Sequence, residues 1–305
     1  MKPESLVSAV VAMPRGWRLW WIAARPRTLS MAVAPVLVGC ALAWAESGQM
    51  RLLPAALALI CAILIQVGTN LLNDAADFER GNDQPDRLGP LRVTAAGWAS
   101  PRAVRQAAKR VFAAAGLAGL ALVWLGGPMI LGVGLASLVA GWAYSGGPRP
   151  ISYTPFGELF VLAFFGVVAV GGTYYLQTGA WSAVALLGGA ALGLMAAAVL
   201  MVNNYRDLPG DVAVGRRTLA ACLGRRGARA AYGLMLWLPF ALLPWLAHGP
   251  LARPGAWLAL AALPAAGAAW RGLRTRRGAA LNLVLAQTAQ AQFIYALLLA
   301  VGVCL

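Results

Sequence analysis

Long apolar stretches without a charged side chain dominate the pattern of the sequence. The stretches that carry no Asp, Glu, Lys or Arg are 52–73, 111–148, 159–205, 230–252 and 278–305. A helix that crosses a bilayer needs about 20 apolar residues, so the two longest stretches each have room for two helices. Gly126-Gly127-Pro128 and Gln177-Thr178-Gly179 supply the breaks between them.

Two shorter apolar segments complete a pattern that predicts about nine transmembrane helices. The predicted helices are 28–45, 52–73, 104–124, 128–145, 157–177, 181–204, 230–247, 254–270 and 283–304. The fold class that follows is an all-α, polytopic integral membrane protein. We expect residues 1–20 to form an N-terminal segment at the membrane interface and residues 21–305 to form a single transmembrane domain.

Composition supports this fold class and excludes others. Apolar residues make up 60% of the chain and charged residues 11%, against about 45–50% and about 25% in ordinary globular proteins. A chain this apolar cannot cover itself with polar surface, which excludes a soluble globular protein, a disordered protein and a fibrous repeat.

The basic residues predict the orientation in the membrane. With nine helices, 23 of the 25 Lys and Arg fall on one side, counting those at the start of the third helix, and only Arg51 and Arg253 fall on the other. Cytoplasmic loops carry such an excess, so we expect a cytoplasmic N-terminus and an outer C-terminus in the cell inner membrane. The net charge of +15 then reflects topology and contact with anionic lipid. We expect no nucleic-acid partner and see no sign of an obligatory protein partner.

Acidic residues are rare and concentrated. Seven of the ten Asp and Glu lie in two short windows, 74–86 and 207–211. Each window follows the cytoplasmic end of an even-numbered predicted helix, so both lie on the same face of the membrane. We therefore expect the active site near the cytoplasmic face.

Within each window the polar residues have helical spacing. Asn70, Asn73, Asp74 and Asp77 fall at i, i+3, i+4 and i+7, which places them on one face of a helix. The second window has Asn203, Asp207 and Asp211 at i, i+4 and i+8, with Asn204 beside them. Acids at a membrane boundary are costly and usually face a cavity.

The chemistry of these two stripes fits a metal and a phosphate. Carboxylate and carboxamide oxygens suit a hard cation such as Mg²⁺, which typically takes one or two carboxylates together with substrate phosphates. Arginine side chains on the same side suit phosphate oxygens: Arg25, Arg27, Arg87, Arg92, Arg149, Arg206, Arg216 and Arg217. Helix capping and solvated ion pairs are the simpler interpretation of one such window. Two windows on one face favour a diphosphate site.

At these residues the sequence resembles the UbiA-type intramembrane aromatic prenyltransferases, most closely their 1,4-dihydroxy-2-naphthoate branch. The first matching segment, at 70–92, reads NLLNDAADFERGNDQPDRLGPLR, and the second, at 203–211, reads NNYRDLPGD. Lesser matches are RPRTL at 25–29, YSGGPRPISY at 144–153 and LNLVLAQTA at 281–289. The resemblance thus extends from the first predicted helix to the last.

The resemblance implies a magnesium-dependent prenyl transfer to an aromatic acceptor. It implies Mg²⁺ ligands at Asn73, Asp77, Asp83, Asp207 and Asp211. Asp77 and Asp207 would be catalytic, assisted by Arg149, Arg206 and Arg216. It implies substrate contacts at Asn70, Asn73, Asp74, Arg25, Arg87, Arg92, Tyr144, Tyr153, Asn203 and Asn204. The sequence departs from the family pattern at Gly81, where the ubiquinone-type pattern has a further Asp, and at Arg216, where Lys is common.

The implied reaction joins a polyprenyl diphosphate to 1,4-dihydroxy-2-naphthoate, with decarboxylation, in menaquinone biosynthesis. Candidate walls for the isoprenoid tail are Phe164, Phe165, Tyr174, Tyr175, Phe293 and Tyr295, each of which ordinary helix packing explains equally well. Other acceptors for the same enzyme class are 4-hydroxybenzoate, homogentisate, a porphyrin and a glycerol phosphate lipid. From a different class, an ion-coupled secondary transporter also places acids within its helices.

Overall fold

The computed structural model describes residues 13–82, 88–249 and 252–305, and all regular structure in these ranges is helical. The all-α prediction is therefore confirmed. The α-helices are α1 (Trp17–Ala24), α2 (Ser30–Ser47), α3 (Leu52–Glu79), α4 (Pro101–Ser145), α5 (Gly157–Leu162), α6 (Ala169–Thr178), α7 (Ala183–Ala213), α8 (Leu219–Ala241), α9 (Leu243–His248), α10 (Leu263–Thr275) and α11 (Leu281–Val303). Short 3₁₀ segments are η1 (Pro26–Thr28), η2 (Ile151–Tyr153), η4 (Pro254–Ala262) and η5 (Gly278–Ala280), and η3 (Ala163–Val168) is a π-helix.

Seven helical segments in the described residues are long and apolar enough to cross a membrane, and three of them, 157–178, 219–248 and 278–303, join consecutive elements. The long helix α4 contains two of the predicted spans, because Gly127 adopts φ 72° and ψ −165° directly before Pro128. Its two halves fold back on each other, since a Cβ at Gly141 would contact the Phe112 ring. The predicted break at Gly127 is thus confirmed. The predicted span 254–270 is divided between η4 and α10, and the total of nine stays a prediction.

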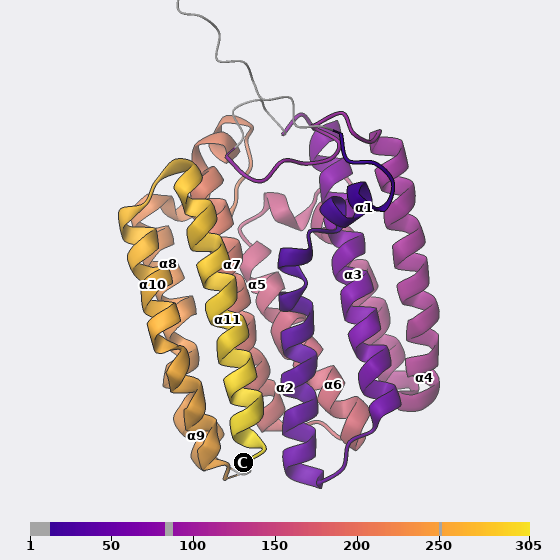
Figure 1. The fold of residues 1–305 in the computed structure, drawn as a ribbon, viewed down its shortest axis with the longest axis vertical. Helices are drawn as coiled ribbons and strands as arrows, with labels where there is room; N and C mark the ends of the chain where they lie inside the picture. The colour runs from indigo at the N-terminus through magenta and orange to yellow at the C-terminus, as the bar shows by residue number, and fades with distance from the viewer. Residues whose placement is uncertain (1–12, 83–87, 250–251) are drawn as a thin grey trace, which may run out of the picture.

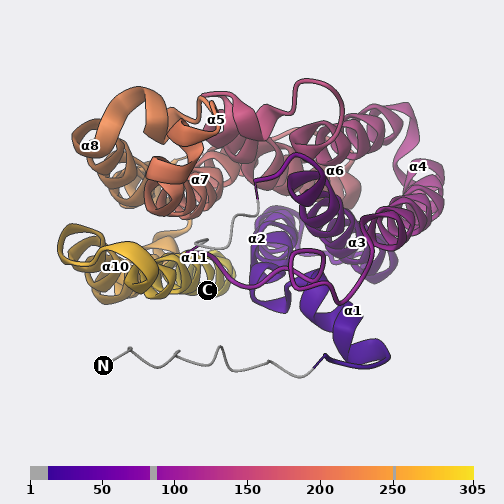
Figure 2. The same ribbon diagram turned by 90° about the horizontal axis from the view of Figure 1, so that it is seen from above.

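The helices run side by side, with α1 and the connection after α3 at one end of the bundle and the C-terminus at the other (Figure 1). Seen along the helices, α2 lies near the middle, with α3 and α4 to one side and α8 and α10 to the other (Figure 2). Accordingly, α2 packs against α3, α6, α7 and α11. The carboxyl ends of α3 and α7, which carry the two polar stripes, lie at the same end of the bundle.

Local sequence explains where the site-bearing helices begin and end. Gly179 ends α6 with φ 76°, as a left-handed C-cap does, and confirms the break predicted between 177 and 179. Ser100 accepts a hydrogen bond from the Ala103 amide at the start of α4, and Thr218 accepts one from Ala221 at the start of α8. Each N-cap closes the connection that follows one polar stripe.

Glycines allow α7 to approach the segment formed by α5 and η3 at main-chain distance. A Cβ at Gly166 would overlap the carbonyl oxygen of Gly189, and a Cβ at Gly193 would overlap that of Leu162. Small residues at helix interfaces of this kind are typical of membrane bundles.

The first predicted unit, 1–20, is described only from residue 13. Its last residues belong to α1, where Trp17, Trp20 and Trp21 are exposed. Exposed tryptophans of this kind are typical of a helix at a membrane interface.

Candidate functional site

A cavity of about 2120 Å³ lies between α2, α3, α4, α6, α7 and α11. Apolar side chains form most of its wall, and polar side chains gather where α3 and α7 end. The structure brings twelve of the predicted site residues to this wall: Arg25, Asn70, Asn73, Asp77, Arg92, Tyr144, Asn203, Asn204, Arg206, Asp207, Asp211 and Arg216. Residues from both windows therefore face one space.

On the α3 side, Asp77 forms a buried ion pair with an arginine from the connection that follows the helix. Arg92 Nη1 lies 2.6 Å from Asp77 Oδ2, and both side chains are less than a tenth exposed. Asn82 donates to the other carboxylate oxygen of Asp77. Asn73 Nδ2 donates to Ser145 Oγ at 2.9 Å, and the side-chain oxygen Oδ1 of Asn73 has no hydrogen-bond partner among the described residues.

On the α7 side, the arginine comes from the same helix as the acids. Arg206 Nε and Nη2 donate to the two oxygens of Asp207 at 2.7 and 2.6 Å, a bidentate pair. Arg206 also donates to Asn203 Oδ1 at 2.9 Å. Because these bonds lie within one helical turn, this half of the site is fixed by α7 itself.

Arg216 lies between the two stripes. Its Nη1 is 3.0 Å from Asp211 Oδ1, and its Nη2 donates to the Ser152 carbonyl. The charge of Arg216 also acts on Asp77. The Arg216 guanidinium therefore interacts with acids from both helices.

Tyr153 lies behind the cavity wall and supports Arg216. The Arg216 guanidinium lies 4.7 Å from the centre of the Tyr153 ring, a cation–π contact. Asn82 donates to the Tyr153 hydroxyl. Burial, and after it the Asp77 carboxylate, raises the pKa of Tyr153, so the phenol stays neutral at physiological pH.

Asn282 of α11 links the two halves of the site. Its Oδ1 accepts from Arg206 Nη1 at 2.6 Å, and its Nδ2 donates to the Leu88 carbonyl at 2.7 Å. Leu88 belongs to the connection that also carries Arg92. The amide of Asn282 therefore holds the Arg206 side chain and this connection together.

Asp74 has a different place from the one predicted. It is 1% exposed and does not line the cavity. Its carboxylate accepts from the amides of Val93 and Thr94 at 3.2 Å and from the Thr94 hydroxyl. With about 100° of rotation per residue, Asp74 lies at the edge of the stripe and anchors the connection rather than facing the cavity.

Two further predicted site residues, Arg149 and Tyr153, do not line the cavity. Arg149 is exposed. Asp83 and Arg87 lie outside the described residues. Among the predicted tail walls, Phe164, Phe165 and Phe293 line the cavity, whereas Tyr174, Tyr175 and Tyr295 do not.

The sequence reasoning missed several polar residues around the site. Gln66 and Thr28 line the cavity, and Ser145, Glu158 and Asn282 hold residues that line it. Glu158 is 2% exposed and accepts from Asn204 Nδ2 at 2.9 Å. Gln66 had a usable signal, because it continues the α3 stripe at i−4 from Asn70 within an otherwise apolar run.

The oxygens at the cavity end fit a hard cation that is shared with a substrate. Asn73 Oδ1 and Asp211 Oδ2 are buried and have no hydrogen-bond partner among the described residues. In that part of the chain, no three His, Cys, Asp or Glu side chains form a group able to hold a metal ion. A cation at this end would be held by oxygens from both stripes together with ligand oxygens, as in Mg²⁺ sites with phosphate substrates.

Comparison with known proteins adds a family and a fold. Residues 32–297 match the family model described as the UbiA prenyltransferase family. A protein of Mycobacterium tuberculosis named 1,4-dihydroxy-2-naphthoate octaprenyltransferase is 38% identical over 289 residues, which cover 92% of this chain and 95% of that protein. An Escherichia coli protein of the same name is 40% identical over 225 residues, or 71% and 72% of the two chains.

The fold is similar to solved structures at low sequence identity. A UbiA homolog from Archaeoglobus fulgidus bound to GPP and Mg²⁺ matches with a TM-score of 0.66 at 16% identity, over 94% of this chain and 99% of that chain. A structure of digeranylgeranylglyceryl phosphate synthase matches with a TM-score of 0.63 at 15% identity, over 94% and 98% of the chains.

Proposed function

This chain belongs to the UbiA prenyltransferase family, and we propose that it transfers a polyprenyl group to 1,4-dihydroxy-2-naphthoate in menaquinone biosynthesis. The donor is a polyprenyl diphosphate, and the acceptor loses its carboxylate as carbon dioxide. Relatives named for this activity are 38% and 40% identical to the chain, the first over nearly its full length. These identities favour the naphthoate over 4-hydroxybenzoate, homogentisate or a porphyrin.

One observation carries the proposal: acids and arginines from two helices meet at one end of a largely apolar cavity. The end formed by α3 and α7 presents Asp77, Asp207 and Asp211 with their paired arginines. A diphosphate suits this end, and an isoprenoid tail suits the apolar remainder of the cavity. A secondary transporter would place its coupling acids near the membrane midplane, whereas these acids lie where helices end.

The reaction needs a leaving group stabilised by charge and a carbocation protected from water. The allylic carbon–oxygen bond breaks, and its electron pair leaves with the diphosphate. The electron-rich ring attacks the allylic cation, a carbon–carbon bond forms, and the carboxylate departs as carbon dioxide, which restores aromaticity. Arg206 and Arg216, held by the pairs described above, would stabilise the negative charge that grows on the diphosphate. The apolar wall excludes water from the cation.

We assign Mg²⁺ to the oxygens of Asn73 and Asp77 on α3 and of Asp207 and Asp211 on α7, with Asp83 as the further candidate. The unpartnered oxygens of Asn73 and Asp211 support this assignment. When bound, the metal ion would neutralise charge on the diphosphate as a Lewis acid. We also propose that the protein lies in the cell inner membrane. The end of the bundle where α3 and α7 end would then face the cytoplasm.

The test is an assay of purified protein in nanodiscs with Mg²⁺, a polyprenyl diphosphate and 1,4-dihydroxy-2-naphthoate, with products identified by mass spectrometry. We expect a prenylated, decarboxylated naphthalene product that disappears with EDTA. A product with a different aromatic acceptor alone would keep the chemistry and reject the naphthoate. Absence of prenyl transfer to every acceptor, combined with solute or ion uptake into proteoliposomes, would reject the enzyme in favour of the transporter.

A further inference from the structure

We propose that Gln66 is a specificity-determining residue for the aromatic acceptor, whose ring hydroxyl donates a hydrogen bond to Gln66 Oε1. This inference rests on the proposed function, because it concerns the second substrate of that reaction. Gln66 is 7% exposed and lines the cavity one helical turn before Asn70 on α3. Its Oε1 is buried and has no hydrogen-bond partner in the described part of the chain.

The neighbouring hydroxyl of Thr28 fixes which way the Gln66 amide points. Thr28 Oγ1 donates its one proton to the Arg25 carbonyl at 2.9 Å. The same oxygen accepts from Gln66 Nε2 at 3.2 Å and from Asn70 Nδ2 at 2.9 Å. A hydroxyl has one donor and two acceptor sites, so Thr28 is saturated and can face only the nitrogen of Gln66.

The Gln66 side chain lines the cavity, and its buried oxygen is therefore an acceptor that no donor in the described residues satisfies. A buried acceptor without a partner is costly, so a ligand with a matching donor is favoured at this point. A prenyl diphosphate offers phosphate oxygens and hydrocarbon and has no hydroxyl or amine to donate. The remaining substrate of the proposed reaction is a dihydroxy aromatic, which carries the required O–H.

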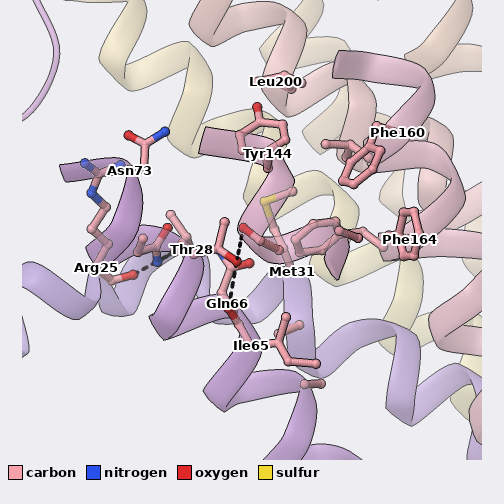
Figure 3. Close-up of a pocket in the computed structure, with 18 of the residues that line it drawn as sticks. Arg25, Thr28, Met31, Ile65, Gln66, Asn73, Tyr144, Phe160, Phe164 and Leu200 are labelled. Atoms are coloured by element: carbon pink, nitrogen blue, oxygen red, sulfur yellow. Dashed lines mark hydrogen bonds between the residues drawn. The ribbon is translucent and has the colours of Figure 1, made fainter. Parts of the chain in front are cut away.

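The surroundings of Gln66 suit a flat aromatic ring. Figure 3 shows Thr28 and Gln66 on one side of the pocket, with Tyr144, Phe160 and Phe164 toward the other. The Phe160 and Phe164 ring centroids are 4.6 Å apart, and those of Tyr144 and Phe160 are 6.1 Å apart. These rings supply apolar faces for stacking, while Gln66 supplies the polar contact that orients the ring.

The position along α3 also fits the reaction. Gln66 precedes Asn73 by seven residues, or about 10 Å of helix. An acceptor ring with its hydroxyl at Gln66 then lies between the apolar wall and the diphosphate end.

The experiment measures binding as well as turnover, using wild-type protein in nanodiscs under anaerobic conditions. Calorimetric titrations compare 1,4-dihydroxy-2-naphthoate with 1-hydroxy-2-naphthoate and 4-hydroxy-2-naphthoate. Because one analogue lacks the hydroxyl that reaches Gln66, we expect wild type to bind it about tenfold more weakly than the dihydroxy compound. Equal affinities for all three compounds would overturn the inference without any variant.

The variant Gln66→Leu keeps the size of the side chain and removes the acceptor. We expect this variant to bind the dihydroxy compound about tenfold more weakly than wild type does, with a matching rise in KM. We also expect it to bind the dihydroxy compound and one of the two analogues with equal affinity. That analogue identifies the hydroxyl at Gln66. The affinity for the prenyl diphosphate should stay unchanged. Gln106→Leu makes the same change on the exposed face of α4 and should behave as wild type.

The other outcomes are decisive. Unchanged acceptor affinity in Gln66→Leu overturns the inference and leaves the proposed function standing. An equal loss of affinity for both substrates indicates a structural role and also overturns it. Wild-type protein that neither binds nor prenylates the dihydroxy compound rejects the proposed function, and this inference with it.

Discussion

The two halves of the site present similar chemistry, but they are built differently. In the α7 half, Asp207 and its cation Arg206 are adjacent residues of one helix. In the α3 half, the cation for Asp77 is Arg92, which lies 15 residues further along in an irregular connection. Helical geometry fixes the first pair, whereas the second depends on how that connection packs.

The difference identifies the residues that only hold the site together. Asp74 anchors the connection next to Arg92 through Val93 and Thr94, and Asn282 ties its beginning to Arg206. The α7 half is thus preformed, and the α3 half is assembled through Asp74 and Asn282. Substitutions should separate these roles.

The largest effect is expected for the acids themselves. Asp77→Ala and Asp207→Ala should each lower kcat/KM by about 10³-fold, because each removes a carboxylate proposed to hold the Mg²⁺ that neutralises the leaving group. Each should also raise the Mg²⁺ concentration needed for half-maximal activity. Initial rates over a Mg²⁺ titration measure both effects. Retention of Mg²⁺-dependent activity in a folded Asp77→Ala protein would remove this residue from the proposed metal site.

Asp74→Ala should come next, although Asp74 does not face the cavity. Release of the connection withdraws Arg92 from Asp77, and a displacement of this kind costs about 10²-fold in kcat/KM. Loss of three hydrogen bonds to a buried carboxylate should also lower the free energy of unfolding by about 3 kcal/mol. Thermal denaturation in detergent and steady-state kinetics measure the two effects.

Asp74→Asn is the matched control for this substitution. It keeps one acceptor oxygen and should give an intermediate loss in both measurements. A protein that is destabilised by Asp74→Ala but keeps full activity would show that the connection is not what positions Arg92.

The smallest of the three effects is expected for the link between the halves. Asn282→Leu should lower kcat/KM about tenfold, because it removes one charge-assisted hydrogen bond to Arg206 and the contact with Leu88. In a double-mutant cycle with Asp74→Ala, the two effects should be less than additive, since both substitutions act on the same connection. Strict additivity would mean that the two residues work independently.

The helical fold and much of the site were predictable from local patterns. Charge-free runs predicted an all-helical bundle, and Gly127 and Gly179 marked real breaks. The spacing of Asn73 with Asp77, and of Asn203 with Asp207 and Asp211, placed these residues correctly on the cavity wall.

What the patterns missed depends on tertiary contacts. Helical spacing alone cannot distinguish the role of Asp74 from that of the other residues in the stripe. The Asp74 carboxylate is engaged by the amides of Val93 and Thr94, and the sequence does not show that these residues pack against it. The contact between Asn282 and Leu88 joins residues 194 positions apart, and no local signal encodes it. Gln66 continues the α3 stripe at i−4 from Asn70, but it was overlooked because it lies within the apolar run, away from the windows in which the acids are concentrated.

The glycine contact between η3 and α7 sets a limit for anyone who wishes to redesign the acceptor range. The main chain that carries Phe164 and Phe165 already touches α7 at Gly166, Gly189 and Gly193, where no side chain is left to remove. This wall therefore cannot move back to accommodate a bulkier substrate. Extra width has to come from trimming the aromatic rings that project into the pocket, with Phe160 and Tyr144 as the first positions to vary.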